Sequence, residues 1–293
     1  MEFLRPATWG DALEALAGHP GAVPIAGGTD VMVEVNFDRA RPAALLDLTR
    51  ITELTGWDTV EGRLRVGAGV PYSDLIDGLR DRLPGLAMAA RTVGSPQIRN
   101  RGTVGGNLGS ASPAGDAHPP LLADDVLVEL ASVRGTRLVP IREFFTGPKR
   151  SVRAADELIA AFHAPPADGP QQFAKVGTRN AMVIAVCSFA LALHPERRTV
   201  GTGIGSAGPV PLPARDAEEF LAAELAACGG WERGSPPSPA AVARFAELVA
   251  DAAAPIDDVR GTAAYRRHAL GVLAGRAFLW AWHDYRDGVA ETA

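Results

Sequence analysis

The sequence predicts an α+β protein with two domains. Its 293 residues exceed what one average core holds, although a single larger domain is the alternative. The first part mixes strand-like and helix-like patterns, and the second part begins with strand patterns and closes with three helical ones. A Pro- and Gly-rich segment, residues 164–170, separates the two parts and predicts the domain boundary.

The composition argues against several classes of protein. The formal net charge is −5, whereas nucleic-acid binders need a concentrated basic surface, so no nucleic-acid partner is expected. No apolar run reaches the length of about 18 residues that a membrane span requires. The opening residues MEFLRPATWG show no basic region followed by an apolar run, as a secretory signal would. A cytoplasmic location is therefore expected.

The chain has only two cysteines, Cys187 and Cys228. Iron–sulfur clusters usually take four thiolates, so this chain alone is not expected to hold one. Cys187 lies in the apolar run VIAVCSFALAL and is expected to be a buried, inert thiol.

The first part of the chain predicts a helix followed by strands. Thr8 is placed to cap a helix in which Asp11 stands at the third position and Leu13 and Leu16 share one face. Strands are expected at residues 22–26, 44–48, 64–66 and 156–163, with regular structure resuming at 121–130 and a turn between strands at Arg134-Gly135. Residues 72–92 are expected to be helical in two pieces broken at Pro84-Gly85, and residues 94–115 to be irregular.

The second part of the chain predicts a sheet followed by helices. Strands are expected at 171–176, 182–193 and 198–205, and helices at 214–226, 239–252 and 262–285. The last helix has a predicted apolar face that includes Tyr265, Leu273, Phe278 and Trp282, expected in the core or at a subunit interface.

The segment PIAGGTD, residues 24–30, is the first chemical signal. A strand leads into two adjacent glycines, which let successive backbone N–H groups point at an anion. Thr29 adds a hydroxyl, and a short helix at 30–35 would add positive potential. The loop is suited to a phosphate group, and a plain tight turn is the alternative.

A second glycine-rich segment, GSPQIRNRGTVGGNLGSASPAGD, spans residues 94–116. Long ordered loops in compact domains are usually functional. Residues 103–107 would bring backbone amides and an Asn side chain against a pyrophosphate, and Asp116 would accept hydrogen bonds from sugar-like hydroxyls. A solvated loop is the alternative. Two such loops in one domain favour a dinucleotide site.

A third segment, GIGSAG at residues 203–208, matches the G-x-G-x-x-G pattern but is not expected to bind a dinucleotide. That pattern requires a helix directly after the turn, and prolines at 209, 211 and 213 forbid one. The six histidines form no zinc-binding spacing, and no nucleophile elbow is present. Because no set of residues for general acid–base catalysis is recognisable, a bound cofactor is expected to carry out the chemistry.

These residues resemble a known family. PIAGGTD, SPQIRNRGTVGGNLGSASPAGD, FFTGP and DDVRGTAAYRRHAL are similar to segments of the FAD-binding medium subunit of the molybdenum hydroxylases, of the xanthine dehydrogenase and carbon monoxide dehydrogenase type. The resemblance covers about residues 3–280. It implies a vanillyl-alcohol-oxidase (VAO/PCMH) type of FAD domain over residues 1–168, with subdomains at about 1–56 and 57–168, and a smaller α+β domain of antiparallel sheet and helices over 169–293.

The resemblance also implies which residues contact FAD. The first pyrophosphate loop would be Pro24, Ile25, Ala26, Gly27, Gly28, Thr29, Asp30 and Val31, and the second Thr103, Val104, Gly105, Gly106 and Asn107. Asp116 would lie near the polyol of the flavin, and the further contacts would be Val93, Ile159 and Lys175. The positive charge of Lys175 would stabilise reduced, anionic flavin. The segment Arg179-Asn180-Ala181-Met182 lacks the aromatic residue that often shields the flavin in this family.

The function implied by the resemblance is electron transfer. A molybdopterin-binding large subunit would hydroxylate the substrate, two 2Fe–2S clusters of a small subunit would carry the electrons, and FAD on this chain would pass them to NAD⁺, a quinone-like carrier or O₂. A dimer of heterotrimers and a xanthine dehydrogenase type of complex are expected, with no catalytic or metal-binding residue on this chain. The substrate of the complex is left open among purines, N-heteroaromatic compounds, aldehydes and carbon monoxide. The alternatives are a stand-alone flavin oxidase and a structural subunit without FAD.

Overall fold

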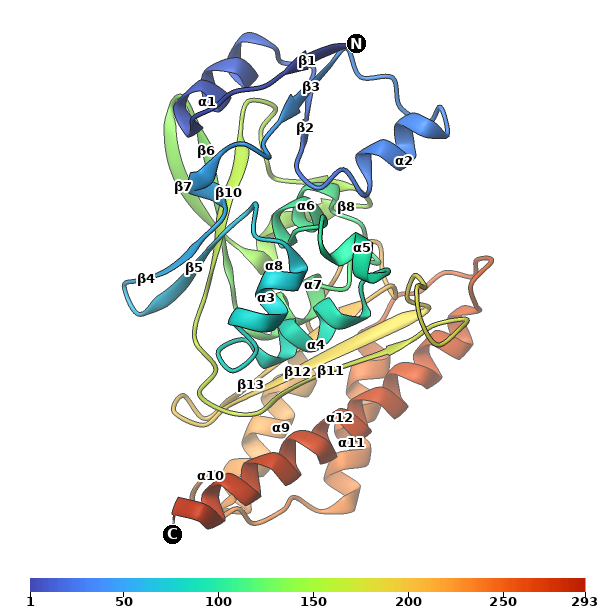
Figure 1. The fold of residues 1–293 in the computed structure, drawn as a ribbon. Coiled ribbons are helices and arrows are strands. Elements are labelled where there is room, and N and C mark those ends of the chain that lie inside the picture. Colours follow the sequence, from blue (N-terminus) through green and yellow to red (C-terminus); the bar gives the residue numbers. More distant parts are fainter. Residues whose placement is uncertain (293) are drawn as a thin grey trace. The chain divides into compact units, whose positions relative to one another are not determined.

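The computed structural model describes residues 1–292, and they form two compact units (Figure 1). The first unit contains Met1–Gly78, Gly94–Ser112 and Val126–Pro165. The second contains Leu79–Val93, Pro113–Asp125 and the chain from Pro166 onward. The two units interleave along the sequence, because two helical segments from the first half of the chain belong to the second unit. The predicted domains, residues 1–168 and 169–293, are instead two continuous stretches of sequence, and this division stays a prediction.

The N-terminal part of the first unit is a small parallel sheet with helix α1, Trp9–Gly18. Its strands lie in the order β1, β3, β2, with bounds Glu2–Leu4, Ala44–Asp47 and Ala22–Ile25. The predicted cap of α1 is confirmed, since the Thr8 hydroxyl accepts a hydrogen bond from the backbone N–H of Asp11 at 3.2 Å. Leu16 of α1 is fully buried. Helix α2, Val31–Asn36, and the 3₁₀ turn η1, Thr52–Leu54, complete this part.

The second sheet of the first unit is antiparallel and has the order β4-β5-β10-β6-β7. The strands are β4 Trp57–Val60, β5 Arg63–Gly67, β10 Leu158–Ala164, β6 Leu127–Ser132 and β7 Gly135–Pro140. The central strand β10 is buried along its whole length. The predicted turn at Arg134-Gly135 is confirmed, because it joins the paired strands β6 and β7. The smaller elements of this unit are α3 Tyr72–Gly78, α8 Ile141–Phe144, β8 Phe145–Gly147 and β9 Arg150–Ser151.

The prediction that residues 94–115 are irregular is wrong, because the segment contains helices α5, Pro96–Arg99, and α6, Val104–Ser110. The Ser95 hydroxyl caps α5, and the Thr103 hydroxyl caps α6 by accepting from the N–H of Gly106 at 2.8 Å. Glycine disfavours helix, but Gly105 lies so close to Ala68, directly after β5, that a Cβ there would come within 2.4 Å of the Ala68 carbonyl oxygen. Close packing and capping therefore override the propensity.

The second unit is built on an antiparallel sheet in the order β11-β12-β13, with bounds Gln171–Val176, Cys187–His194 and Thr199–Gly205 (Figure 1). Alternate residues of the fully buried β12 serve two cores. Phe189 and Leu191 pack with helices α9 Arg215–Ala227, α11 Pro239–Ala252 and α12 Ala263–Thr292. Ala190 and Ala192 belong to a smaller cluster with residues of α4 Pro84–Thr92 and α7 His118–Ala123. The remaining short helix is α10, Gly230–Arg233.

Two predictions in the second unit need correction. The strand expected at 182–193 begins only at Cys187, because Met182 has a positive φ of 53° that no strand accommodates. Leu273, Phe278 and Trp282 are buried as expected, but Tyr265 is 49% exposed. Helical periodicity places Tyr265 seven and fourteen residues before Val272 and Leu279, which are also exposed, so it lies on the outer face.

Within the described residues, no helix is both long and apolar enough to cross a lipid bilayer.

Candidate functional site

The first predicted loop directly follows a strand of the parallel sheet. Pro24 and Ile25 end β2, where they pair with Leu46 and Asp47 of β3. The next residues turn into α2, which starts at Val31, and Gly28 adopts a positive φ of 76° that favours glycine. The loop is half-buried, so its backbone is held by the fold and still reachable from solvent.

The fold brings this loop into contact with Arg101 and Gly102, which lie in the middle of the second glycine-rich segment, residues 94–116. A Cβ added to Gly27 would lie 1.7 Å from the carbonyl oxygen of Arg101, so only glycine permits this approach. A Cβ on Gly102 would lie 3.5 Å from the hydroxyl of Thr29. The two glycine-rich segments, separated by about 70 residues in sequence, therefore lie side by side within the first unit.

The backbone N–H groups of the first loop are available to a ligand. Among the described residues, none accepts a hydrogen bond from the amides of Gly27, Gly28 and Thr29. Unpaired amides are stable only where they meet water or another acceptor, and successive amides of this kind form concave sites for anions. The observed backbone therefore fits the diphosphate group that the sequence predicts here.

The second predicted segment, residues 103–107, forms the first turn of α6. Thr103, Val104 and Gly105 are buried, whereas Gly106 is exposed, and a Cβ on it would meet only the Thr103 hydroxyl at 3.2 Å. The surface beside Gly106 is consequently open to a ligand. Ile159, on β10, is buried beneath the same helix, with its δ-methyl 3.8 Å from the position of a Cβ on Gly109.

The other three predicted contacts belong to the second unit. Val93 ends α4, Asp116 precedes α7, and Lys175 lies on β11. The Lys175 ammonium donates to Asp116 Oδ2 at 2.6 Å, and both side chains are about nine-tenths buried. Burial raises the pKa of the Asp116 carboxyl, and the charge and hydrogen bond of Lys175 act in the opposite direction. Asp116 and Lys175 thus form a buried ion pair.

The Asp116–Lys175 pair has partners that the sequence did not suggest. Lys175 also donates to the backbone oxygens of Thr92 at 3.0 Å and Val183 at 3.2 Å. Both acceptors are main-chain atoms, so no pattern of residue types predicts them. Thr92 is distant from Lys175 in sequence, and Val183 lies across the loop that follows β11. The hydroxyl of Thr92 lies 3.3 Å from Asp116 Oδ2, and it also donates to the Ala89 oxygen at 2.8 Å.

The carboxylate of Asp116 has one free oxygen. Among the described residues, none forms a hydrogen bond with Oδ1, although this atom is buried. An acceptor left unpaired in the interior is costly, which indicates a site for a donor such as a hydroxyl group. The observed geometry therefore fits the predicted polyol contact at Asp116.

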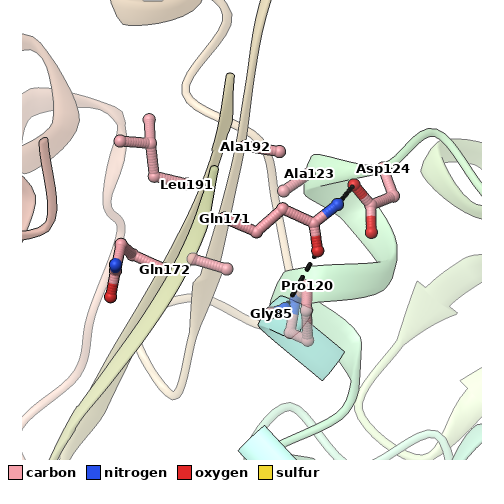
Figure 2. A pocket seen from close by; sticks show the side chains of 9 residues that line it. Gly85, Pro120, Ala123, Asp124, Gln171, Gln172, Leu191 and Ala192 are labelled. Carbon is pink, nitrogen blue, oxygen red and sulfur yellow. Dashed lines mark hydrogen bonds between the residues drawn. The ribbon is translucent and has the colours of Figure 1, made fainter. Parts of the chain in front are cut away.

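A small hollow of the second unit is a packed junction (Figure 2). It is too narrow to hold a water molecule and lies beside Gln171, which accepts from the N–H of Gly85 at 2.9 Å and donates to Asp124 at 2.7 Å. Figure 2 shows the amide of Gln171 pointing between these two partners. Burial raises the pKa of Asp124 to about 8. Because its polar groups satisfy one another, the hollow offers little to a ligand.

The remaining candidate groups support no second site. The GIGSAG segment continues β13 and then bends without forming a helix, as the prolines predicted. Cys187 is fully buried, and burial raises the pKa of its thiol to about 11. In the part of the chain that the structure describes, no three His, Cys, Asp or Glu side chains gather as metal ligands would.

Comparison with protein families gives two matches that together span most of the chain. Residues 1–167 match the FAD binding domain in molybdopterin dehydrogenase. Residues 172–281 match the CO dehydrogenase flavoprotein C-terminal domain.

The individual proteins that the chain resembles are subunits or chains of dehydrogenases. The chain is 35% identical over 227 residues to the xanthine dehydrogenase FAD-binding subunit of Escherichia coli O157:H7, covering 74% of this chain and 77% of that one. It is 34% identical over 234 residues to the nicotinate dehydrogenase FAD-subunit of Eubacterium barkeri, covering 75% and 79%. A solved carbon monoxide dehydrogenase chain from Hydrogenophaga pseudoflava superposes with a TM-score of 0.87 at 28% identity, covering 97% and 98%.

Proposed function

The chain belongs to the family of FAD-binding medium subunits of the molybdenum hydroxylases, and we propose that it serves as the electron-transfer subunit of a xanthine dehydrogenase-type complex. The observation that carries the proposal is the contact between the two glycine-rich segments, whose first member presents unpaired amides. Backbone amides arranged in this way suit the diphosphate of a dinucleotide.

The residues have separate roles in this proposal. The segments 24–31 and 103–107 hold the diphosphate, and Ile159 supports α6 from below. Asp116 accepts a hydrogen bond from the polyol, while Val93 lies next to Thr92, whose oxygen Lys175 contacts. FAD, when bound, accepts electrons singly and releases them in pairs, which suits a link between one-electron clusters and a two-electron acceptor.

The proposed partners follow from the family. A molybdopterin-binding large subunit would carry out hydroxylation, and a small subunit with 2Fe–2S clusters would deliver electrons to this chain in a dimer of heterotrimers. NAD⁺ is the proposed acceptor, and the cytoplasm is the proposed location. A purine such as xanthine is the proposed substrate, because the chain is 35% identical to the xanthine dehydrogenase subunit. Its identity to the nicotinate dehydrogenase subunit is nearly the same, 34%.

Purification of the full chain tests the cofactor first. The proposal predicts the visible absorbance bands of a flavin and one FAD per chain, and a pure, folded protein that takes up no FAD would contradict it. Co-expression with a molybdopterin subunit and an iron–sulfur subunit of the same complex then tests the substrate. Turnover of xanthine with NAD⁺ is expected. If the complex turns over nicotinate or carbon monoxide but not xanthine, the proposal of a purine substrate is wrong.

A further inference from the structure

Lys175 is a buried lysine in a chain whose basic residues are almost all arginines. Of the 29 basic residues, only Lys149 and Lys175 are lysines, and all others are arginines. Lys149 is exposed and pairs with Glu34, whereas the Lys175 side chain is only 8% exposed. A lysine ammonium is a compact group with three donors, whereas an arginine guanidinium is a planar fork. A buried position occupied by lysine in such a chain therefore indicates a need for the compact group.

The partners of Lys175 account for all three of its donors. They are Asp116 Oδ2 at 2.6 Å, the Thr92 oxygen at 3.0 Å and the Val183 oxygen at 3.2 Å. These acceptors come from the end of α4, from the segment before α7 and from the loop between β11 and β12. The ammonium thus ties three chain segments to β11, and within the described residues its hydrogens are already used.

Asp116 depends on Lys175 for its orientation. The hydroxyl of Thr92 has one hydrogen, and the shorter contact of that hydroxyl, 2.8 Å, goes to the Ala89 oxygen rather than to Asp116 at 3.3 Å. Lys175 is therefore the strong partner of Oδ2. With Oδ2 fixed, the rotation of the carboxylate is fixed as well, and Oδ1 keeps the buried position in which no described residue bonds to it.

We infer that Lys175 is a positioning residue, which holds Asp116 so that Oδ1 accepts a hydrogen bond from a polyol hydroxyl of FAD. The inference rests on the proposed function and changes the role expected for this lysine. A salt bridge of 2.6 Å is neutral as a whole, so its positive charge is offset by Asp116 and contributes little to the potential at the flavin ring.

The redox state of FAD separates the two roles. The polyol is chemically the same in oxidised and reduced FAD, so a lysine that only positions Asp116 affects the affinity for both forms equally. A lysine that stabilises the reduced ring affects mainly the affinity for the reduced form. For a two-electron couple, a tenfold change in the ratio of these affinities shifts the midpoint potential by about 30 mV.

The test uses the full chain and the double variant Lys175→Met/Asp116→Asn, which replaces a neutral pair by a neutral pair. FAD affinity is measured by quenching of flavin fluorescence, and the midpoint potential of bound FAD by redox titration. We expect at least about a tenfold loss of affinity, as for removal of a charged hydrogen bond, and a potential within about 30 mV of wild type. A potential lowered by more than that, or an unchanged affinity, would overturn the inference.

Two further variants make the result robust. Lys175→Arg keeps the charge but cannot satisfy three converging acceptors, so it should also weaken FAD binding by at least about tenfold. Retained affinity in Lys175→Arg contradicts the inference even if the double variant does not fold. Lys149→Met, at the other lysine, should bind FAD like wild type. Wild-type protein without FAD would instead refute the proposed function itself.

Discussion

Two glycine-rich regions of this chain look alike in sequence but differ in structure. In the first unit, Gly27 lets residues 24–31 pack against Arg101, and the amides of the loop find no acceptor among the described residues. In the second unit, Gly201 and Gly203 of β13 make room for α7, since a Cβ on either would come within about 2 Å of a carbonyl oxygen of Ala123 or Pro119.

The comparison separates two uses of glycine. The backbone of β13 is engaged in a ladder with β12, where Gly201 pairs with Ala192 and Gly203 with Ala190. Both regions gain a close approach from the missing Cβ, but only the first leaves donors unpaired. A glycine-rich segment therefore indicates a ligand site only where the amides have no partner in the fold.

The largest effect is expected for Gly203→Ala in β13. The new methyl would lie 2.0 Å from the carbonyl oxygen of Pro119, so α7 and the sheet must separate. Overpacking of a rigid backbone contact costs about 3 kcal/mol or more, and we expect a large drop in thermal stability or loss of soluble protein. Gly56→Ala is the control, because nothing lies within 4 Å of a Cβ there. Equal stability of the two variants would contradict this account of β13.

Gly106→Leu should have the opposite outcome, with folding retained and binding lost. A Cβ at Gly106 meets only the Thr103 hydroxyl, and leucine favours helix over glycine by about 1 kcal/mol. The side chain would cover the surface where the diphosphate is proposed to lie, so FAD affinity should fall at least about a hundredfold, or about 2.7 kcal/mol. Fluorescence titration and a melting curve measure the two effects. The same substitution at Gly21, where a Cβ has no neighbour within 4 Å, should leave binding intact.

Asp124→Asn should stabilise the protein in a pH-dependent way. Burial raises the pKa of Asp124 to about 8 from about 3.8, so the protonated side chain is the form that suits the fold. The favourable contribution is complete below pH 4 and is lost as the pH rises towards 8. Asparagine also accepts the bond from Gln171 but does not ionise, and we expect a gain on the order of several kcal/mol at pH 8 and none at pH 4.

Urea unfolding at the two pH values measures the change. Asp81→Asn, at a side chain that is 90% exposed, is the matched control and should show no such dependence. A gain for Asp124→Asn that is equal at both pH values would show that ionisation is not its cause.

The sequence predicted what depends on local chemistry and missed what depends on contacts between distant residues. The cap at Thr8 was predictable because Thr8 and Asp11 are neighbours in sequence. Helix α6 was not, because Gly105 is explained only by its approach to Ala68. The glycine-rich loops and Asp116 were singled out from the sequence, but the bond from Lys175 to the Val183 oxygen involves a main-chain atom that no residue type marks. Tyr265 was misplaced because the apolar face was assigned without its helical phase.

Hydrogen–deuterium exchange of the full chain, with and without FAD, tests the difference between the two glycine-rich regions most directly. Saturating FAD should slow exchange at the amides of residues 27–29, which have no partner in the described fold, and leave residues 201–205 unchanged because their strand is already paired. Protection that is confined to residues 201–205, or unchanged exchange at 27–29 while FAD is bound, would contradict the account.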